Sequence, residues 1–342
     1  MLDNHVLYRK YRPKTFAEVR GQEEVVRTLE QAVKSGKPAH AYLFTGGRGT
    51  GKTTLARILA KSLGVLDHDI VEMDAASNRG VDDVRQLRDA VQTLPMESAY
   101  KVFIIDEVHM LTKEAFNALL KTLEEPPKHV LFVLATTELD RVPDTIRSRC
   151  QVYRLKNPSH AVLGDLVRDI VKSEGYAIDT NAVRDIVRTG DGSFRDTLGA
   201  LQRIMTHVTG ENITSADTSV VFELPSRQHI HTLLGALAAG DGKSAIETIF
   251  TIGNSGKALE RFIEHVIDEV RTILLARFAP DVIDLGGESD DYKTAIETFK
   301  KEKAINSELL AKLLAVYNDM KKTSLPQVPV TIFLSAWFEK IK

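Results

Sequence analysis

A glycine-rich loop near the start of the chain has the composition of a phosphate-binding site. It fits the pattern G-x-x-x-x-G-K-[ST] without a mismatch, and its residues are Gly46, Gly47, Arg48, Gly49, Thr50, Gly51, Lys52 and Thr53. Glycines allow several backbone N–H groups to point at one anion, because no side chain blocks the turn. Lys52 then reaches the β- and γ-phosphates, and the Thr53 hydroxyl is placed to coordinate Mg²⁺ at a helix start. The loop predicts a site for a nucleoside triphosphate.

Two acidic residues after a second apolar run supply the other half of such a site. Asp106 and Glu107 follow residues 102–105, a run typical of a central parallel strand whose carboxyl end faces the ligand. Asp106 is placed to hold Mg²⁺ through water, and Glu107 to orient or deprotonate the attacking water. Thr136 and Thr137 end another apolar run. Their hydroxyls either touch the γ-phosphate or the attacking water, or belong to a plain turn.

These side chains require a scaffold in which strands and helices alternate. Apolar runs predict strands at 41–44, 69–74, 101–107 and 130–135, and helical spacing predicts helices at 22–33, 53–63, from 81 onward and at 113–123. Four parallel strands joined by helices indicate an α/β doubly wound sheet that binds its ligand at the strand ends. A short apolar piece at 152–155 then precedes the breaker Pro158.

The second half of the chain has a helical pattern, and no strand pattern of any length follows Ser159. Short amphipathic stretches predict a small helical domain, and wide apolar faces then predict an all-α domain. The stretches are 161–174, 181–189 and 194–208, followed by 230–239, 243–252, 258–278, 292–299, 307–321 and 328–341. Residues 210–225 are polar and broken, so we divide the chain into 1–157, 158–212 and 213–342. The apolar helices of the last part suit either assembly or an ordinary helical core.

Bulk composition excludes several classes of protein. The 342 residues are 43% hydrophobic with a net charge of -2, which argues against a uniformly basic nucleic-acid coat protein. The single cysteine, Cys150, excludes an internal disulfide and a multi-cysteine zinc site, and it fits a reducing compartment such as the cytoplasm. No run approaches the roughly 18 apolar residues of a membrane span, and the first residues lack the apolar core of a secretory signal.

Three further segments have both a structural and a functional interpretation. The basic and aromatic run at 8–16 is either a solvated arm or a strap over the nucleotide base. Ser77, Asn78 and Gly80 suit the start of the helix near residue 81, as a simple cap or as a second anion site. Arg195 lies in the first turn of its helix, where the helix dipole disfavours a cation. This suggests that an arginine is needed at this position for a contact, such as one with a phosphate.

Together these motifs resemble the AAA+ ATPase superfamily and, within it, the gamma/tau family of bacterial DNA polymerase III clamp loaders. The resemblance extends from about Tyr8 to Ala200, and residues 116–127, FNALLKTLEEPP, are its most diagnostic segment. The other residues that carry it are Tyr11-Arg12-Pro13, Phe16, 19–22, 40–44, the phosphate loop, 74–77, 105–111, 134–137 and Ser148-Arg149-Cys150. The implied fold is an AAA+ domain with a parallel sheet, then a helical lid and an all-α collar.

The resemblance implies roles that the chemistry alone left open. Thr137 would be sensor 1, and Arg195 would be sensor 2, contacting the γ-phosphate of its own subunit's ATP. Arg149 would be an arginine finger that acts in trans on ATP bound by a neighbouring subunit, an effect of ~10³–10⁵ in rate. Segment 8–22 would cover the adenine, with nucleotide contacts from Tyr8, Arg12, Pro13, Val19 and Thr54.

The same resemblance implies an assembly. Family members use ATP and Mg²⁺ to load a ring-shaped sliding clamp onto primed DNA as part of DNA polymerase III. We expect a hetero-pentamer with delta- and delta-prime-type subunits, self-association through the collar, and no membrane. Ser77, Asn78 and Arg79 would track DNA phosphates without reading bases.

Two departures from the family pattern stand out. The family typically carries a four-cysteine zinc module after the phosphate-loop helix, whereas here residues 64–68 pass directly to the next strand, so no zinc is expected. The chain also ends at Lys342. We interpret it as a short form, or a part, without the polymerase- and helicase-binding tail of the longer form.

Two alternatives come from other classes of protein. A stator subunit of the same assembly would keep the fold and the finger without hydrolysis, but it has no need of Lys52, Thr53, Asp106 and Glu107 together. A branch-migration helicase would assemble as a homohexamer and lack the finger context of residues 148–150.

Overall fold

The computed structural model describes residues 6–78, 80–223, 226–253, 256–282 and 290–341. The chain divides into two compact units. The first comprises Met1–Gly175 and Ile186–Arg203, and the second comprises Tyr176–Asp185 and Ile204–Lys342. Two boundaries between these units fall inside helices, and no boundary falls at residue 157 or 212. The three-part organisation expected from the sequence therefore stays a prediction.

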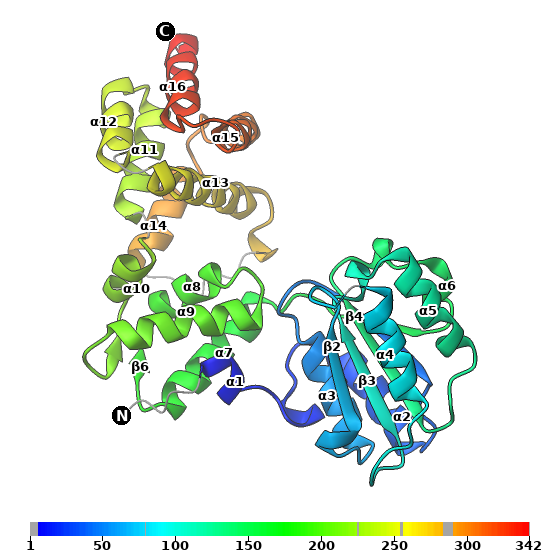
Figure 1. Ribbon diagram of the computed structural model, residues 1–342. Coiled ribbons are helices and arrows are strands. Elements are labelled where there is room, and N and C mark those ends of the chain that lie inside the picture. Colours follow the sequence, from blue (N-terminus) through cyan, green and yellow to red (C-terminus); the bar gives the residue numbers. More distant parts are fainter. Residues whose placement is uncertain (1–5, 79, 224–225, 254–255, 283–289, 342) are drawn as a thin grey trace. The chain divides into compact units, whose positions relative to one another are not determined.

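A five-stranded parallel sheet organises the described part of the first unit (Figure 1). Its strands are β1 (Ala41–Thr45), β2 (Ile70–Asp74), β3 (Lys101–Asp106), β4 (Val130–Thr136) and β5 (Gln151–Arg154), in the spatial order β2-β3-β4-β1-β5. The parallel α/β class is confirmed. The fifth strand corresponds to the short apolar piece at 152–155. It is an edge strand whose Val152 side chain is 41% exposed, so its apolar signal is weak.

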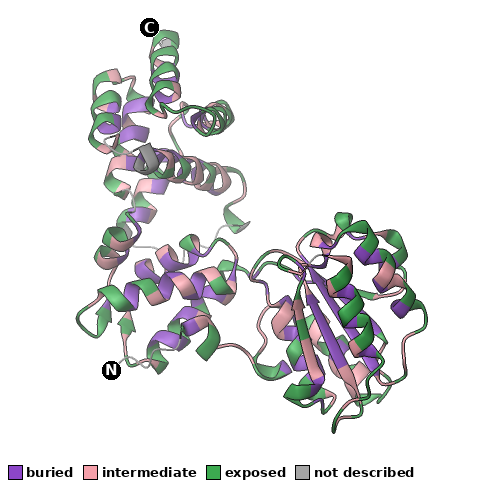
Figure 2. Cartoon of the chain, viewed as in Figure 1, coloured by how far each residue is buried: buried purple, intermediate pink, exposed green. Residues whose placement is uncertain are grey.

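Helices cover both faces of the sheet, because successive strand side chains point to opposite sides. Leu43, Phe103 and Phe132 pack with α4 (Val81–Val91) and α5 (Lys113–Glu124). The alternate residues Tyr42, Phe44 and Ile104 pack with α2 (Glu23–Lys34) and α3 (Lys52–Ser62). Figure 2 shows the central strands as almost continuously buried. Shorter elements complete this part: α1 (Leu7–Lys10), η1 (Phe16–Glu18), η2 (Asp67–Asp69), η3 (Val108–Met110), η4 (Leu139–Arg141) and α6 (Asp144–Arg147).

The register of the sheet brings the carboxyl ends of its strands to one edge. Thr45 of β1 pairs with Thr136 of β4, and Asp74 of β2 pairs with Asp106 of β3. Because β4 lies between β1 and β3, the residues after β4 stand between the phosphate loop and the acidic pair.

The helices predicted after the sheet are present. They are α7 (His160–Ser173), α8 (Thr180–Thr189) and α9 (Phe194–His207). The Ser159 hydroxyl accepts a hydrogen bond from the Val162 N–H at 3.3 Å and so caps α7.

Two expectations for the second unit were wrong. A two-stranded parallel sheet pairs β6 (Ala177–Ile178) with β7 (Asn212–Ile213), and these strands are too short to produce a period in the sequence. The stretch taken as polar and broken contains helix α10 (Ser215–Phe222). Thr214 caps it, since Asp217 N–H donates to Thr214 Oγ1 at 3.4 Å and Thr214 N–H donates to Asp217 Oδ2 at 2.8 Å. The T-x-x-D spacing was the signal for this cap.

The regular elements described in the rest of the second unit are helices, as predicted. Its helices are α11 (Arg227–Ala239), α12 (Gly242–Ile252), α13 (Gly256–Phe278), η5 (Pro280–Val282), α14 (Asp290–Phe299), α15 (Ser307–Met320) and α16 (Gln327–Ile341). The α-helices among them share one apolar core. In it the buried Glu269 carboxylate faces His231 Nε2 at 3.0 Å and accepts a hydrogen bond from the Tyr292 hydroxyl at 3.1 Å. Within the described residues, no helix combines the length and the apolar character needed to cross a membrane.

Candidate nucleotide-binding site

The glycine-rich loop joins the buried strand β1 to helix α3, as its sequence predicts. Gly49 has a φ of +69°, and a Cβ at this position would lie 2.0 Å from Ser193 Oγ. A Cβ on Gly46 would lie 2.6 Å from the Leu155 carbonyl oxygen. Glycine is therefore required both for the backbone conformation and for the close approach of neighbouring segments.

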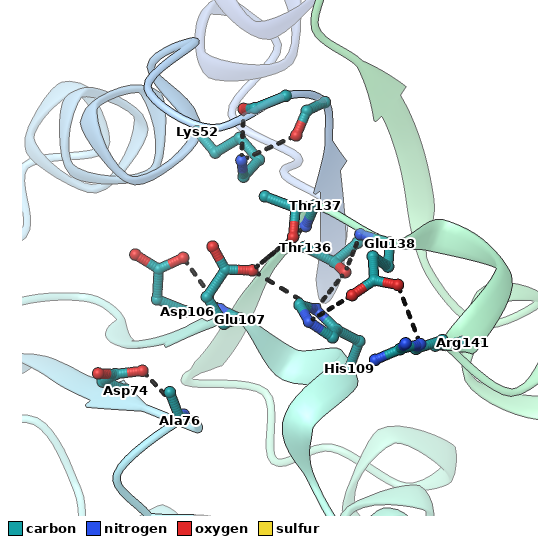
Figure 3. A network of polar contacts seen from close by, with 12 residues as sticks. Lys52, Asp74, Ala76, Asp106, Glu107, His109, Thr136, Thr137, Glu138 and Arg141 are labelled. Atoms are coloured by element: carbon teal, nitrogen blue, oxygen red, sulfur yellow. Dashed lines mark hydrogen bonds and ion pairs between the residues drawn. The ribbon is translucent and has the colours of Figure 1, made fainter. Parts of the chain in front are cut away.

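Lys52 lies inside the curve of this loop. Its side chain is buried, and Nζ donates hydrogen bonds to the carbonyl oxygens of Gly46 at 2.9 Å and Gly47 at 2.8 Å (Figure 3). Burial lowers the pKa of Lys52, while the nearby carboxylates of Glu107 and Asp106 oppose that shift. Arg48, by contrast, is exposed, and the Thr50 hydroxyl donates to the Gly47 carbonyl at 2.9 Å, which holds the loop closed.

A hydroxyl and a carboxylate meet next to the loop. The Thr53 hydroxyl donates to Asp106 Oδ2 at 2.6 Å, although 53 positions separate the two residues in the sequence. Magnesium takes oxygen ligands, commonly one or two from the protein with the remainder from phosphates and water. The donor set therefore fits the metal pair expected from the sequence.

Glu107 has an unusual backbone conformation. Its φ is +47° and its ψ is +45°, in the left-handed region that a non-glycine residue rarely adopts. Its Oε2 accepts hydrogen bonds from the Thr137 hydroxyl at 3.1 Å and from the Thr137 N–H at 3.3 Å. The structure thus joins Glu107 to the threonine named as sensor 1, across the end of β4.

Residues next to Arg195 and in the N-terminal segment contact the phosphate loop and the start of α3. Phe194 N–H donates to the Gly49 carbonyl at 3.1 Å, and the Arg195 guanidinium lies 5.8 Å from the centroid of the Tyr8 ring. Arg12 Nε donates to Thr54 Oγ1 at 3.0 Å, and burial lowers the pKa of Arg12. Pro13 and Val19 are half-buried, with Val19 packed against the core of α2 and α3.

The N-terminal segment is packed rather than solvated. Lys10 pairs with Glu174 at 2.9 Å, and the Tyr11 hydroxyl also donates to Glu174. Burial and the Glu174 carboxylate raise the pKa of Tyr11 to about 12. Leu7 is buried, and its N–H donates to Gln202 Oε1 at 2.7 Å. These contacts favour the strap over the solvated arm, while its contact with a nucleotide base stays a prediction.

Arg149 contacts a different set of residues. Nη2 lies 2.7 Å from Glu124 Oε1, and Nη1 donates to the Thr145 carbonyl at 2.7 Å. Glu124 ends α5 and Thr145 belongs to α6. The contacts that the structure gives Arg149 therefore lie away from the phosphate loop of its own chain.

Of the three residues proposed for the start of the helix near residue 81, Gly80 is confirmed as its cap, and the assignment of Ser77 and Asn78 was wrong. Helix α4 begins after Gly80, whose N–H donates to Asp83 Oδ2 at 2.9 Å. Asn78 Nδ2 instead donates to the Asp74 carbonyl at 3.0 Å, because this segment forms a turn at the end of β2. Ser77 is exposed, and Arg79 lies outside the described residues.

His109, Glu138 and Arg141 form a polar cluster beside Glu107 that sequence reasoning missed (Figure 3). His109 was noted only as part of a family motif. Its position two residues after Glu107 was the available signal. Its partners Glu138 and Arg141 follow the carboxyl end of β4, and sequence spacing does not show that this end lies beside His109.

Comparison with known proteins identifies the family. A family model described as "DNA polymerase III, delta subunit" matches residues 21–79 and 65–159. DNA polymerase III subunit gamma of Buchnera aphidicola is 35% identical over an alignment of 293 positions, which covers 78% of this chain and 80% of the relative. The chain belongs to the DNA polymerase III gamma/tau family.

Longer members of this family match as well. DNA polymerase III subunit tau of Bacillus subtilis is 37% identical over an alignment of 349 positions, which covers 94% of this chain and 61% of the relative. Subunit gamma/tau of Mycobacterium tuberculosis is 38% identical over an alignment of 303 positions, which covers 82% of this chain and 52% of the relative. The chain therefore spans between about half and three-fifths of the length of these two relatives.

Solved structures of another protein share the fold. The Thermotoga maritima RuvB Holliday junction branch migration motor aligns with a TM-score of 0.53 at 23% identity, over 66% of this chain and 79% of that chain. This likeness shows the fold alone.

Proposed function

We propose that this chain is the ATP-hydrolysing motor subunit of a DNA polymerase III clamp loader, which opens a sliding clamp and loads it onto primed DNA. One observation carries the proposal: Lys52, the Thr53–Asp106 pair and the Glu107–Thr137 pair gather in a single site, in a chain of the gamma/tau family. A stator subunit has no need of this complete set.

Each residue has a role in this proposal. The loop N–H groups and Lys52 bind the triphosphate, and Thr53 and Asp106 hold Mg²⁺, which neutralises charge on the phosphates. Glu107 orients the attacking water or accepts its proton, and Thr137 fixes the Glu107 carboxylate for that task. Arg195 contacts the γ-phosphate, which the hydrogen bond between its neighbour Phe194 and Gly49 supports.

The active site is composite in this proposal. Arg149 supplies its cation to ATP bound by an adjacent subunit, and its contacts with α5 and α6 rather than with its own loop support this role. An isolated chain should hydrolyse ATP slowly, because an arginine finger is worth ~10³–10⁵ in rate.

The C-terminal helices provide the means of assembly. Apolar side chains are exposed four residues apart on α12, where Ile246 is 46% and Phe250 is 75% exposed, and on α16, where Val328 is 46% and Ile332 is 63% exposed. They support self-association through the collar, in a hetero-pentamer with delta- and delta-prime-type subunits. We further propose a cytoplasmic protein without bound zinc, in which segment 77–79 contacts DNA phosphates.

The proposal is tested by the ATPase rate of the assembled complex alone, with primed DNA, with the clamp, and with both. We expect the highest rate with both, and equal rates under all four conditions would count against clamp loading. Lys52→Ala should abolish nucleotide binding, whereas Lys34→Ala, a change of a largely exposed lysine, should not. Tight ATP binding by Lys52→Ala would show that the loop has another role.

A further inference from the structure

His109 lies in a position that the reaction proposed above does not use. Its side chain is only 5% exposed, and the two ring nitrogens face different partners. Nδ1 lies 2.9 Å from Thr136 Oγ1 and 3.4 Å from Glu107 Oε2, and Nε2 lies 3.3 Å from Glu138 Oε1 (Figure 3). Each ring nitrogen therefore has a polar partner on a different side, a hydroxyl and a carboxylate at Nδ1 and a carboxylate at Nε2.

These contacts anchor the turn that aims Glu107. The left-handed conformation of Glu107 is strained, and such strain persists only where the surroundings hold it. Met110 N–H donates to the Glu107 carbonyl at 2.9 Å and closes the turn η3, while the His109 ring ties that turn to the end of β4. Glu138 N–H donates to the same Thr136 hydroxyl at 3.0 Å, so the anchor is itself fixed.

The cluster also reaches the surface. Glu138 Oε2 pairs with Arg141 Nε at 2.9 Å, and these side chains are 44% and 63% exposed. A continuous set of polar contacts therefore runs from Arg141 at the surface through Glu138 and His109 to Glu107.

We propose that His109 is a positioning residue for hydrolysis, which holds the strained turn that aims Glu107 and couples it to the surface pair Glu138–Arg141. The inference rests on the proposed function of this site. A histidine that only fills space in the core would affect folding, and it would not separate turnover from nucleotide binding.

Three substitutions in the full chain, assembled with its partners, test this role. His109→Leu removes both contacts, His109→Asn keeps a polar group near the Nδ1 position, and His109→Gln keeps one near Nε2. We expect His109→Leu to lower kcat about 10- to 100-fold, as misplacement of a reacting group does, with unchanged affinity for a fluorescent ATP analogue. Asn and Gln should each restore part of kcat. His129→Gln is the matched control, because the His129 ring is half-buried in the same domain and its Nε2 lies 3.3 Å from the Val91 carbonyl oxygen, a contact that involves no residue of the cluster.

Coupling to the surface is tested by Glu138→Gln, alone and with His109→Leu. The double variant should lose little more kcat than His109→Leu, since both changes break one chain of contacts. Additive losses would remove the surface pair from the proposal. A wild-type kcat in His109→Leu, or equal losses of kcat and affinity, would overturn the positioning role.

Crystal structures separate this inference from the proposed function. If the wild-type assembly hydrolyses no ATP, the proposed function fails. The inference is then decided by the conformation of Glu107 in His109→Leu: departure from Thr137 supports it, and an unchanged left-handed turn refutes it.

Discussion

Replacing Arg149 with alanine should separate stability from catalysis in this chain. The Arg149 guanidinium pairs with Glu124 at 2.7 Å, and the two side chains are 34% and 44% exposed. Exposed pairs of this kind contribute about 0.2–1 kcal/mol. Arg149→Ala should therefore lower the free energy of unfolding by no more than about 1 kcal/mol.

The expected loss in catalysis is much larger. A finger worth ~10³–10⁵ in rate corresponds to about 4–7 kcal/mol of transition-state stabilisation. The matched control is Arg147→Ala, because Arg147 is similarly exposed at 32% and pairs with Asp144 in the same segment. Arg147→Ala should keep the ATPase rate of the assembly, while Arg149→Ala should lose it with a thermal unfolding midpoint lowered by no more than about 4 °C.

A mixing assay shows on which subunit Arg149 acts. Assemblies made from Arg149→Ala and Lys52→Ala chains contain sites in which an intact loop meets an intact Arg149 from the neighbouring chain. Such mixtures should regain ATPase activity that neither variant has alone. Mixtures that assemble but stay inactive would refute action in trans, and an Arg149→Ala assembly with the wild-type rate would refute the finger altogether.

Three other changes have definite expected outcomes. Glu107→Gln should keep ATP binding and lower single-turnover hydrolysis about 10²- to 10⁴-fold, the usual contribution of a general base; wild-type hydrolysis would place the base elsewhere. Gly49→Ala should weaken binding of a fluorescent ATP analogue and lower the unfolding temperature, whereas Gly36→Ala, with a similar φ of +63° but no atom within 4 Å of the added Cβ, should leave ATP binding unchanged. Asp69→Asn should lower the free energy of unfolding, measured by urea unfolding, by about 1–3 kcal/mol at pH 7. The reason is that the buried Asp69 carboxylate accepts hydrogen bonds from the N–H groups of Met96 at 2.7 Å, Ser98 at 3.0 Å and Glu97 at 3.3 Å. Burial alone would raise the pKa of Asp69, but these donors lower it overall. The stability that the Asp69 carboxylate contributes is therefore present above its unfolded pKa of about 4 and is lost as the pH falls below that value. The difference in unfolding free energy between wild type and Asp69→Asn should shrink in acid and not in base.

The scaffold of the site was predictable because its signals are local. The loop pattern, the buried runs of β1, β3 and β4, and the acids after β3 each occupy a few consecutive residues. The α/β class followed from their alternation with helices. The same local reasoning missed α10, whose cap at Thr214 lies among polar residues that resemble a loop.

The contacts between distant segments were not predictable from spacing. Nothing in the sequence states that β4 lies between β1 and β3, and this order is what joins Thr137 to Glu107. The cluster around His109 depends on the same order. The cap of α4 was misassigned for a related reason, since Ser77 and Asn78 satisfy the end of β2 instead.

Because the five strands run in the same direction, the domain should tolerate insertions and deletions at one edge of the sheet and not at the other. Each strand residue advances the chain by about 3.3 Å, and the loss of one residue also turns the following side chains to the opposite face. A deletion within β3 or β4 would thus move Asp106 or Thr137 away from the nucleotide site at the carboxyl ends of the strands. Extra residues before β2, β3 or β4 lie at the opposite edge, where the strands begin, and would leave both residues in place. Residues 64–68 precede β2 at that edge, and the family resemblance would place a zinc module there. We expect natural insertions and engineered fusions alike to be accepted there without effect on hydrolysis.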